Sequence, residues 1–249
     1  MEGLLAGCMV FLYGIVIGSF LNVCIYRIPR GEDLIRVSSH CTSCGYRLKW
    51  YDLFPIVSFL ALGGKCRKCK EKISCQYPII EAVNGGLYVL IFCVNGWEVQ
   101  SVIYCLMASA LLVLSVIDFR TYEIPFGINV FIFILGCINL GLDWADWKNY
   151  LIGFFAVSAF LYLLYLLTKG RAIGGGDIKL MAAAGMLLGW KKIILAFVLG
   201  CILGSVIHLV RMRVTKAEHV LAMGPYLSAG IFIAALWGDS LIWMYLNLW

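Results

Sequence analysis

Charged side chains are scarce in this chain and make up only 14% of its 249 residues. Hydrophobic residues reach 62%, and the mean hydropathy is +0.91. A soluble domain of this length carries far more polar surface, so the composition excludes a soluble globular protein. Long apolar runs recur along nearly the whole sequence and indicate a polytopic membrane protein.

Three other patterns are also missing. The apolar runs are continuous and not alternating segments of about ten residues, which argues against a membrane β-barrel. No low-complexity tract or internal repeat of solenoid period is found, so a repeat architecture is excluded. The first apolar run, Leu4 to Ile25, lacks a basic leading region and a small-residue cleavage site. We therefore expect a retained span and not a signal peptide.

The sequence predicts an all-α polytopic membrane protein with about eight transmembrane helices. The expected spans cover residues 4–26, 79–95, 100–117, 125–141, 149–168, 178–190, 191–210 and 222–246. The span 178–190 is short for a full crossing, so we expect it to be tilted or partly re-entrant.

Three functional segments follow from this arrangement. They are a first transmembrane helix at 1–26, a four-cysteine loop at 27–77, and a seven-helix membrane core at 78–249.

Basic residues are concentrated in the loop that follows the first span. Ten of the twenty Lys and Arg residues lie between Arg27 and Lys72, which places this loop in the cytoplasm by the positive-inside rule. Eight alternating spans then put seventeen of the twenty basic residues on the cytoplasmic side. Nucleic-acid binding is the rival explanation, but anionic lipids next to the loop already account for its charge.

Two aspartates, Asp118 and Asp177, stand where a long apolar run meets a short polar segment. Ionisable residues at the edge of a bilayer are costly and suggest a functional site. Two facing carboxyl groups cannot both ionise cheaply, so they share a proton and divide acid and base roles, as in an aspartic protease. Three glycines, 174–176, precede Asp177, and we expect them to allow unusual backbone conformations and close chain approach. The alternative is that each Asp caps a helix or pairs with an Arg.

Four cysteines in the basic loop form two CxxC pairs, Cys41 with Cys44 and Cys66 with Cys69. The spacing is that of a zinc ribbon, in which four thiolates close a tetrahedral structural site. A reducing cytoplasm disfavours disulfides between them, and unmetallated thiols remain the alternative. His40 is a possible substitute ligand, although a solvated side chain beside the first pair is the simpler interpretation. We therefore predict a small zinc-ribbon-like loop between the first two spans.

Five ordered motifs resemble those of the type IV prepilin peptidases, across nearly the whole chain. They are the segment from Gly18 to Pro29, the double CxxC loop with Tyr77-Pro78-Ile79-Ile80-Glu81, Asp118 to Pro125, Gly174 to Leu180, and Met223 to Tyr226. One departure is Phe126, where the family usually has Asp or Asn. We expect this change to alter local polarity without abolishing activity.

The resemblance implies a bifunctional enzyme of a bacterial cytoplasmic (inner) membrane, with its active site facing the cytoplasm. It would cleave the basic leader from prepilin or pseudopilin precursors that carry a hydrophobic N-terminal helix. It would then N-methylate the new terminus with S-adenosylmethionine. Carried over by position, the catalytic residues would be Asp118 and Asp177 in the peptidase core, supported by Gly174, Gly176, Lys179 and Pro125. The loop at 27–77 would be the part associated with methyl transfer, with zinc ligands Cys41, Cys44, Cys66 and Cys69, and Glu81 is a weak candidate near the methyl donor.

The residues themselves support peptide cleavage but do not reveal methyl transfer. No strand–GxGxxG–helix unit is visible, so the methyl donor rests on the resemblance alone. Because the leader and the loop are both basic, the leader must be attracted by individual acidic residues and not by the overall charge of the loop. The candidates are Glu32, Asp33, Asp52, Glu71 and Glu123. Partners would be membrane lipids and precursors, with no nucleic acid.

Rival classes remain. They are a proton-coupled transporter, a scaffold with a zinc-ribbon docking module, and a peptidase that does not methylate.

Overall fold

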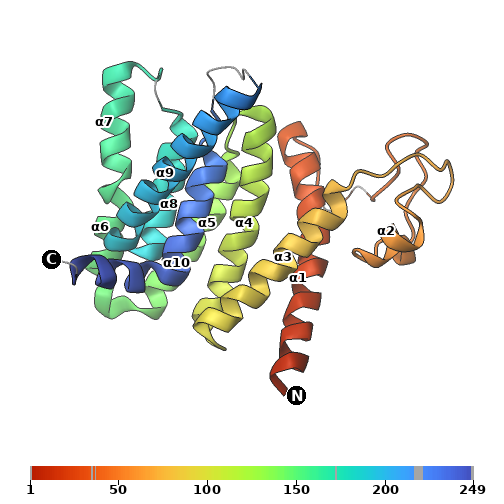
Figure 1. Ribbon diagram of the computed structural model, residues 1–249, viewed down its shortest axis with the longest axis horizontal. Helices are drawn as coiled ribbons and strands as arrows, with labels where there is room; N and C mark the ends of the chain where they lie inside the picture. The colour runs from red at the N-terminus through yellow and green to blue at the C-terminus, as the bar shows by residue number, and fades with distance from the viewer. Residues whose placement is uncertain (1, 35, 37, 172, 216–220, 248–249) are drawn as a thin grey trace. The chain divides into compact units, whose positions relative to one another are not determined.

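The computed structural model describes residues 2–34, 36, 38–171, 173–215 and 221–247 (Figure 1). Within these residues the chain is helical and forms no extended strand. Two isolated antiparallel bridges, His40–Arg47 and Lys65–Lys72, are its only β-type pairings there. The chain divides into two compact units, Met1–Trp97 and Glu98–Trp249, which are described separately below.

The first unit is built on two long helices, α1 (Glu2–Arg27) and α3 (Gln76–Asn95). They pack through glycine: a Cβ atom at Gly14 would lie 2.6 Å from the Cα of Gly85, and one at Gly18 would lie 2.7 Å from the Cα of Glu81. The small residues therefore let the two helix backbones touch. The loop between them contains the 3₁₀ turns η1 (Ile28–Arg30) and η2 (Trp50–Asp52) and the short helix α2 (Val57–Ala61).

The second unit is a helical bundle. Its elements are α4 (Val99–Thr121), α5 (Phe126–Leu142), the 3₁₀ turn η3 (Trp144–Asp146), α6 (Trp147–Ala156), α7 (Ser158–Thr168), α8 (Gly175–Leu188), α9 (Trp190–Thr215) and α10 (Gly224–Leu246). Its interior is apolar, with Met107, Leu114, Leu180, Ile193 and Ile231 all fully buried.

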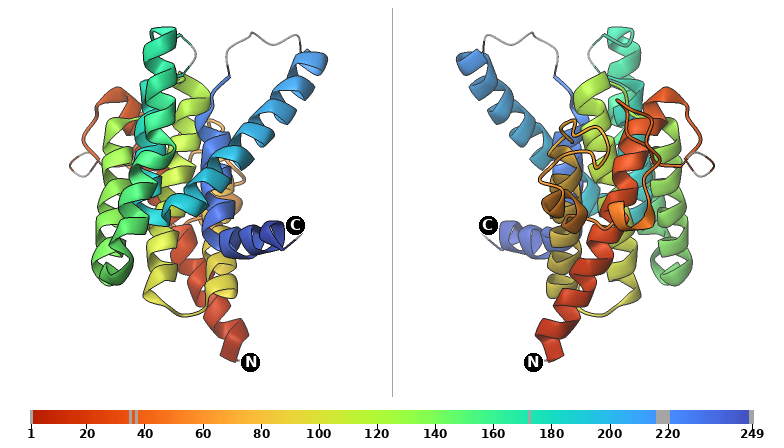
Figure 2. Two further views of the ribbon diagram at one scale, coloured as in Figure 1. Left: turned by 90° about the vertical axis from the view of Figure 1, so that its left-hand side faces the viewer. Right: turned by 90° about the vertical axis from the view of Figure 1, so that its right-hand side faces the viewer.

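Helix α8 lies between α5 and α6 in this bundle (Figures 1 and 2). The backbones of Gly153 on α6 and Gly185 on α8 approach so closely that neither position has room for a Cβ. On the other side of α8, a Cβ at Gly136 of α5 would lie 3.1 Å from Leu187 N and Met186 C. This dry packing fixes the position of α8, and with it Asp177 in its first turn.

Among the described residues, six helical segments are long and apolar enough to cross a membrane: Gly3–Arg30, Gln76–Asn95, Val99–Thr121, Trp144–Thr168, Trp190–Arg213 and Gly224–Leu246. The protein is thus a multi-pass membrane protein. The prediction of about eight full spans is confirmed only in part.

The two remaining predicted spans correspond to α5 and α8, which have 17 and 14 residues. Helix α8 ends where Gly189 takes a positive φ of 81°. Its 14 residues make it about 21 Å long, whereas the hydrocarbon core of a bilayer is about 30 Å thick. The expected shortness of this span has a local cause in that glycine.

The boundary between the compact units differs from the predicted functional segments. Helix α3 belongs with α1 and the four-cysteine loop in the first unit, whereas the sequence prediction placed residues 78–95 in the membrane core. The reason is the glycine contact between α1 and α3, which is not visible from hydropathy. The assignment of activities to segments stays a prediction.

The arrangement of the second unit generates a topological prediction. Asn149 on α6 is hydrogen bonded to the N–H of Trp190 at the start of α9, at the opposite end of α8 from Asp177. Single cysteines placed at Thr121 or Arg171 should therefore be shielded from an impermeant thiol reagent in intact cells, whereas one at Asn149 should react. The background is a chain in which the native cysteines that react are replaced. Labelling at Thr121 but not Asn149 would reverse the predicted orientation.

Candidate active site and metal site

Asp118 lies in the last turn of α4 and is 5% exposed. Its Oδ2 accepts a hydrogen bond of 2.8 Å from the backbone N–H of Gly224, at the start of α10. A Cβ at Gly224 would lie 2.7 Å from the same oxygen, so only glycine lets the backbone come this close. Helix α4 ends four residues later at Tyr122, which adopts a left-handed φ of 55° and turns the chain toward α5.

Asp177 occupies the first turn of α8, three residues after the N-cap residue Gly174. Its carboxylate lies against Gly174, whose backbone N–H hydrogen bonds to it, so this side chain does help to cap the helix. It also lies close enough to Asp118 for the two charges to interact. The predicted pair is therefore brought together at one end of the second unit, and the capping role coexists with the pairing.

The three glycines before Asp177 have distinct environments. A Cβ at Gly174 would lie 3.2 Å from Asp177 Oδ2, and one at Gly176 would lie 2.8 Å from the Cβ of Ile124. A Cβ at Gly175 would meet nothing within 4 Å. None of the three has a positive φ, so the expectation of unusual backbone conformations is wrong here. The glycines serve close approach, and only the first and third are required for it.

Pro125 and Lys179 support the same region. Pro125 is the N-cap residue of α5 in extended conformation and follows Ile124, the residue that contacts Gly176. The Lys179 ammonium lies 5.1 Å from the ring centre of Phe126, as a cation–π contact. Phe126 thus contacts the Lys179 ammonium through its ring, whereas an aspartate at this position would form an ion pair with it.

Other polar residues near this end of the bundle escaped the sequence reasoning. The amide of Asn129 is 3% exposed, and the hydroxyl of Ser228 belongs to a residue that is 4% exposed. Within the described part of the chain, neither group has a hydrogen-bond partner. They follow Pro125 and Gly224 by one helical turn, and an isolated polar residue within an apolar span was the only available signal.

The four cysteines of the two CxxC pairs come together in the first unit. Their Sγ atoms all lie within 4.8 Å of one another, and those of Cys41 and Cys69 are 3.8 Å apart. Four sulfurs at about 2.3 Å from one zinc ion would be about 3.8 Å apart, so the cluster fits a tetrahedral metal site. The backbone N–H groups of Cys44 and Ser43 lower the pKa of the Cys41 thiol to about 6. His40 is not part of the cluster; its Nδ1 lies 3.1 Å from the carbonyl of Ser38.

The two CxxC turns have the same backbone design. In each, the residue after the second cysteine has a positive φ: 67° for Gly45 and 61° for Lys70. The N–H of this residue donates to the carbonyl of the first cysteine, Cys41 or Cys66. Each turn is therefore shaped by the same backbone bond, and the two turns present their thiols to one point.

Asp52 connects the second turn to the segment between the pairs. Its side chain is 2% exposed, and its Oδ1 accepts a bond of 2.7 Å from Arg67 Nε. Its Oδ2 accepts the N–H of Lys49 at 3.2 Å. This pairing raises the pKa of the Arg67 guanidinium. The expectation that Asp52 is available to attract a basic leader is wrong, because its carboxylate is buried and already paired.

Glu81 lies in the second turn of α3 and is 5% exposed. It is not part of a metal-binding cluster in the described residues. Its Oε2 accepts a hydrogen bond of 2.7 Å from the backbone N–H of Ile56.

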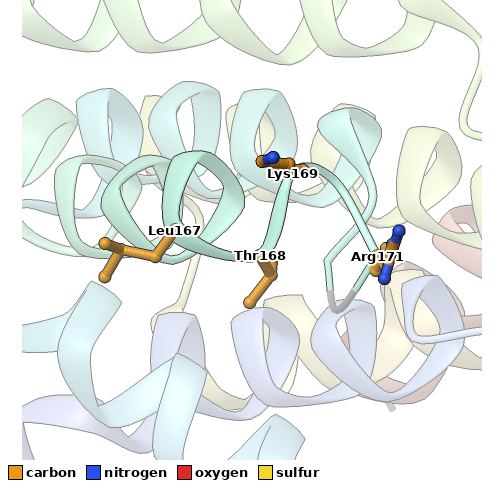
Figure 3. A pocket seen from close by; sticks show the side chains of 4 residues that line it. All are labelled: Leu167, Thr168, Lys169 and Arg171. Atoms are coloured by element: carbon orange, nitrogen blue, oxygen red, sulfur yellow. The ribbon is translucent and has the colours of Figure 1, made fainter.

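An open surface pocket lies at the end of α7 in the second unit (Figure 3). It is lined by Leu167, Thr168, Lys169 and Arg171, on the segment that leads to Gly174. Two cations face it, so its field favours an anionic group and would not attract a basic peptide.

Taken together, these features define a multi-pass helical membrane protein with paired aspartates at helix ends and a loop whose four clustered cysteines could hold a metal ion. Residues 12–95 match the model of the Bacterial Peptidase A24 N-terminal domain, and residues 105–209 match that of the Type IV leader peptidase family. The chain belongs to the type IV leader peptidase family.

Curated relatives extend this similarity over the whole chain. A "Prepilin leader peptidase/N-methyltransferase" of Bacillus subtilis is 32% identical over 96% of this chain and 98% of the relative. Proteins with the same name from Neisseria gonorrhoeae and Pseudomonas aeruginosa are 32% and 30% identical, over 95% of this chain and 92% of each relative. No solved structure matches the chain.

The glycine environments generate a paired prediction. Gly176→Ala should lower the unfolding free energy by about 1–3 kcal/mol, because its methyl group would overlap Ile124. Gly175→Ala, which adds the same methyl group to open space in the same helical turn, should leave stability unchanged or slightly raised. Thermal unfolding in detergent measures both variants. Equal stability of the two variants would show that the close approach at Gly176 is not required.

Proposed function

We propose that this chain is a membrane aspartic endopeptidase that removes the leader from type IV prepilin-like precursors and N-methylates the new N-terminus. The observation that carries the peptidase part is the pairing of Asp118 and Asp177, from α4 and α8, at one end of the second unit. The names of the curated relatives, each covered over most of its length, support both activities.

In the proposed cleavage step, one ionised aspartate takes a proton from water while its protonated partner polarises the scissile carbonyl. The water oxygen bonds to the carbonyl carbon, and the proton is returned to the leaving amine as the C–N bond breaks. The Gly224 N–H holds Oδ2 of Asp118 and fixes the orientation of the carboxyl group. Gly174 and the helical turn fix Asp177 in the same way, so the pair is preorganised before substrate binds.

Cys41, Cys44, Cys66 and Cys69 would hold a structural zinc ion, which would supply folding free energy to the loop and no chemistry. S-adenosylmethionine would supply the methyl group. The described residues form no extended strand, so the donor would not bind through a strand–glycine-rich-turn–helix unit. Glu81 stays a candidate near this second activity.

The enzyme would lie in a bacterial cytoplasmic membrane with Asp118 and Asp177 at the cytoplasmic face, among lipids and precursors. Its substrates would be prepilins or pseudopilins with a basic leader and a hydrophobic N-terminal helix. With Asp52 buried, the acids left to attract the leader locally include Glu123, exposed in the turn between α4 and α5. A peptidase that does not methylate is the second candidate, and the assembled four-cysteine cluster argues against it.

The direct test mixes the purified protein with a prepilin-like precursor and S-adenosylmethionine, and determines the product N-terminus by mass spectrometry. A shortened and methylated product is expected. A shortened product without the methyl group would favour the second candidate, and an intact precursor would exclude both.

The aspartates carry a specific prediction. Asp118→Asn and Asp177→Asn should each reduce cleavage by roughly 10³-fold or more, because Asn keeps the shape but cannot exchange the proton and such pairs fail as units. The rate of leader release in detergent measures this, with thermal unfolding as the control for folding. Substantial cleavage by either folded variant would contradict the assignment.

The zinc loop carries a prediction of separable activities. Wild-type protein should contain about one zinc ion per chain, and the Cys41→Ser, Cys66→Ser variant should contain none. That variant should still release the leader but yield an unmethylated product, because the loss of zinc unfolds the small loop and not the helical bundle.

Asp177→Asn is the reciprocal control and should methylate a pre-cleaved pilin. A zinc-free variant whose cleavage is as poor as that of the Asp variants, with its spans still inserted, would place the loop in the protease site.

A further inference from the structure

Ile56 occupies a strained backbone position in the four-cysteine loop. Its φ is 60° and its ψ is −52°, and the N–H of Val57 donates to the carbonyl of Pro55. This is a γ-turn whose central residue has a positive φ, a type of turn that is rare and strained. A β-branched residue is especially disfavoured there, so the surrounding structure must hold it.

Glu81 is the group that holds this turn. Its Oε2 accepts a short hydrogen bond of 2.7 Å from the Ile56 N–H. Glu81 is itself fixed where α1 and α3 cross, because Gly18 packs on its backbone and the Ser19 hydroxyl bonds to its carboxylate. The carboxylate therefore joins both long helices of the first unit to the loop.

The turn connects to the metal-binding cysteines through continuous contacts. Residues 50–61, which contain Ile56, are tied to the second CxxC turn by the ion pair between Asp52 and Arg67. The same segment presents large apolar side chains to the outside: Trp50, Leu53, Phe54, Val57 and Leu60. The orientation of residues 50–61 on the helices thus depends on the bond that Ile56 donates to Glu81. It also depends on the ion pair between Asp52 and Arg67, beside the cysteine cluster.

We propose that Glu81 is a positioning residue for the methyl transfer, which acts by holding the strained turn at Ile56 and so fixing residues 50–61. The proposal rests on the proposed function in placing methyl transfer on this loop. It assigns Glu81 no contact with the methyl donor. A donor-binding role and a positioning role then differ in what a glycine at position 56 would do, because glycine adopts this conformation without strain.

Four variants test the proposal. Glu81→Leu removes the acceptor, and Glu81→Gln keeps an acceptor oxygen at nearly the same place. Glu81→Leu combined with Ile56→Gly removes both the acceptor and the need for it. Asn84→Leu is the matched control, since it removes a buried bond of 2.7 Å from α3 to the carbonyl of Gly14 on α1.

Methylation of a pre-cleaved pilin, leader release and amide hydrogen exchange of residues 53–61 are measured for each variant. Glu81→Leu should methylate at least tenfold more slowly and exchange faster in this segment, with leader release within about twofold of wild type. Glu81→Gln should keep most methylation, the Ile56→Gly combination should regain several-fold over Glu81→Leu, and Asn84→Leu should methylate normally.

The outcomes separate the possible failures. Equal loss in Glu81→Gln and Glu81→Leu without recovery by Ile56→Gly would overturn positioning in favour of a direct contact with the donor. Unchanged exchange of residues 53–61 in Glu81→Leu would also overturn it. If wild-type protein does not methylate, the proposed second activity fails, while the exchange data still decide whether Glu81 holds the turn.

Discussion

The constraint on which the site depends is that a polar group buried in an apolar environment must find its partner within the protein. Asp118 meets it through the backbone N–H of Gly224, and Glu81 through that of Ile56. In both cases a glycine beside the carboxyl-bearing residue lets a second backbone come near: Gly224 at Asp118 and Gly18 at Glu81. The glycines that let two backbones approach closely therefore also help to fix the position of each acid.

Local patterns predicted which candidate residues lie together, because such patterns depend on short stretches of sequence. Two CxxC spacings are enough to indicate four converging thiols, and their Sγ atoms do lie within 4.8 Å of one another. The polar breaks at Asp118 and Asp177 indicated a pair of acids, and the two side chains interact. Hydropathy likewise predicted the helical class and most of the spans, since each requires only a continuous apolar run.

Features that depend on distant partners could not be predicted in this way. Nothing near Asp52 in the sequence shows that Arg67 pairs with it and removes it from solvent. The packing of α3 on α1, which moved a boundary of the predicted segments, depends on glycines about seventy residues apart. Of the two roles expected of the glycines at 174–176, close chain approach is found and unusual backbone conformation is not. The sequence could not show which glycine makes the approach, because the room for Ile124 beside Gly176 is a tertiary property.

The same constraint explains how one chain could carry two activities that fail separately. The bonds that hold Asp118 and Asp177 come from Gly224 and Gly174, all within the second unit. The bonds that hold the cysteine loop come from Asp52, Arg67 and Glu81, all within the first. Each set of anchoring bonds is thus contained within one unit, so the loss of one set does not by itself remove the other. A defect in the loop should therefore leave in place the bonds from Gly224 and Gly174 that hold the two aspartates.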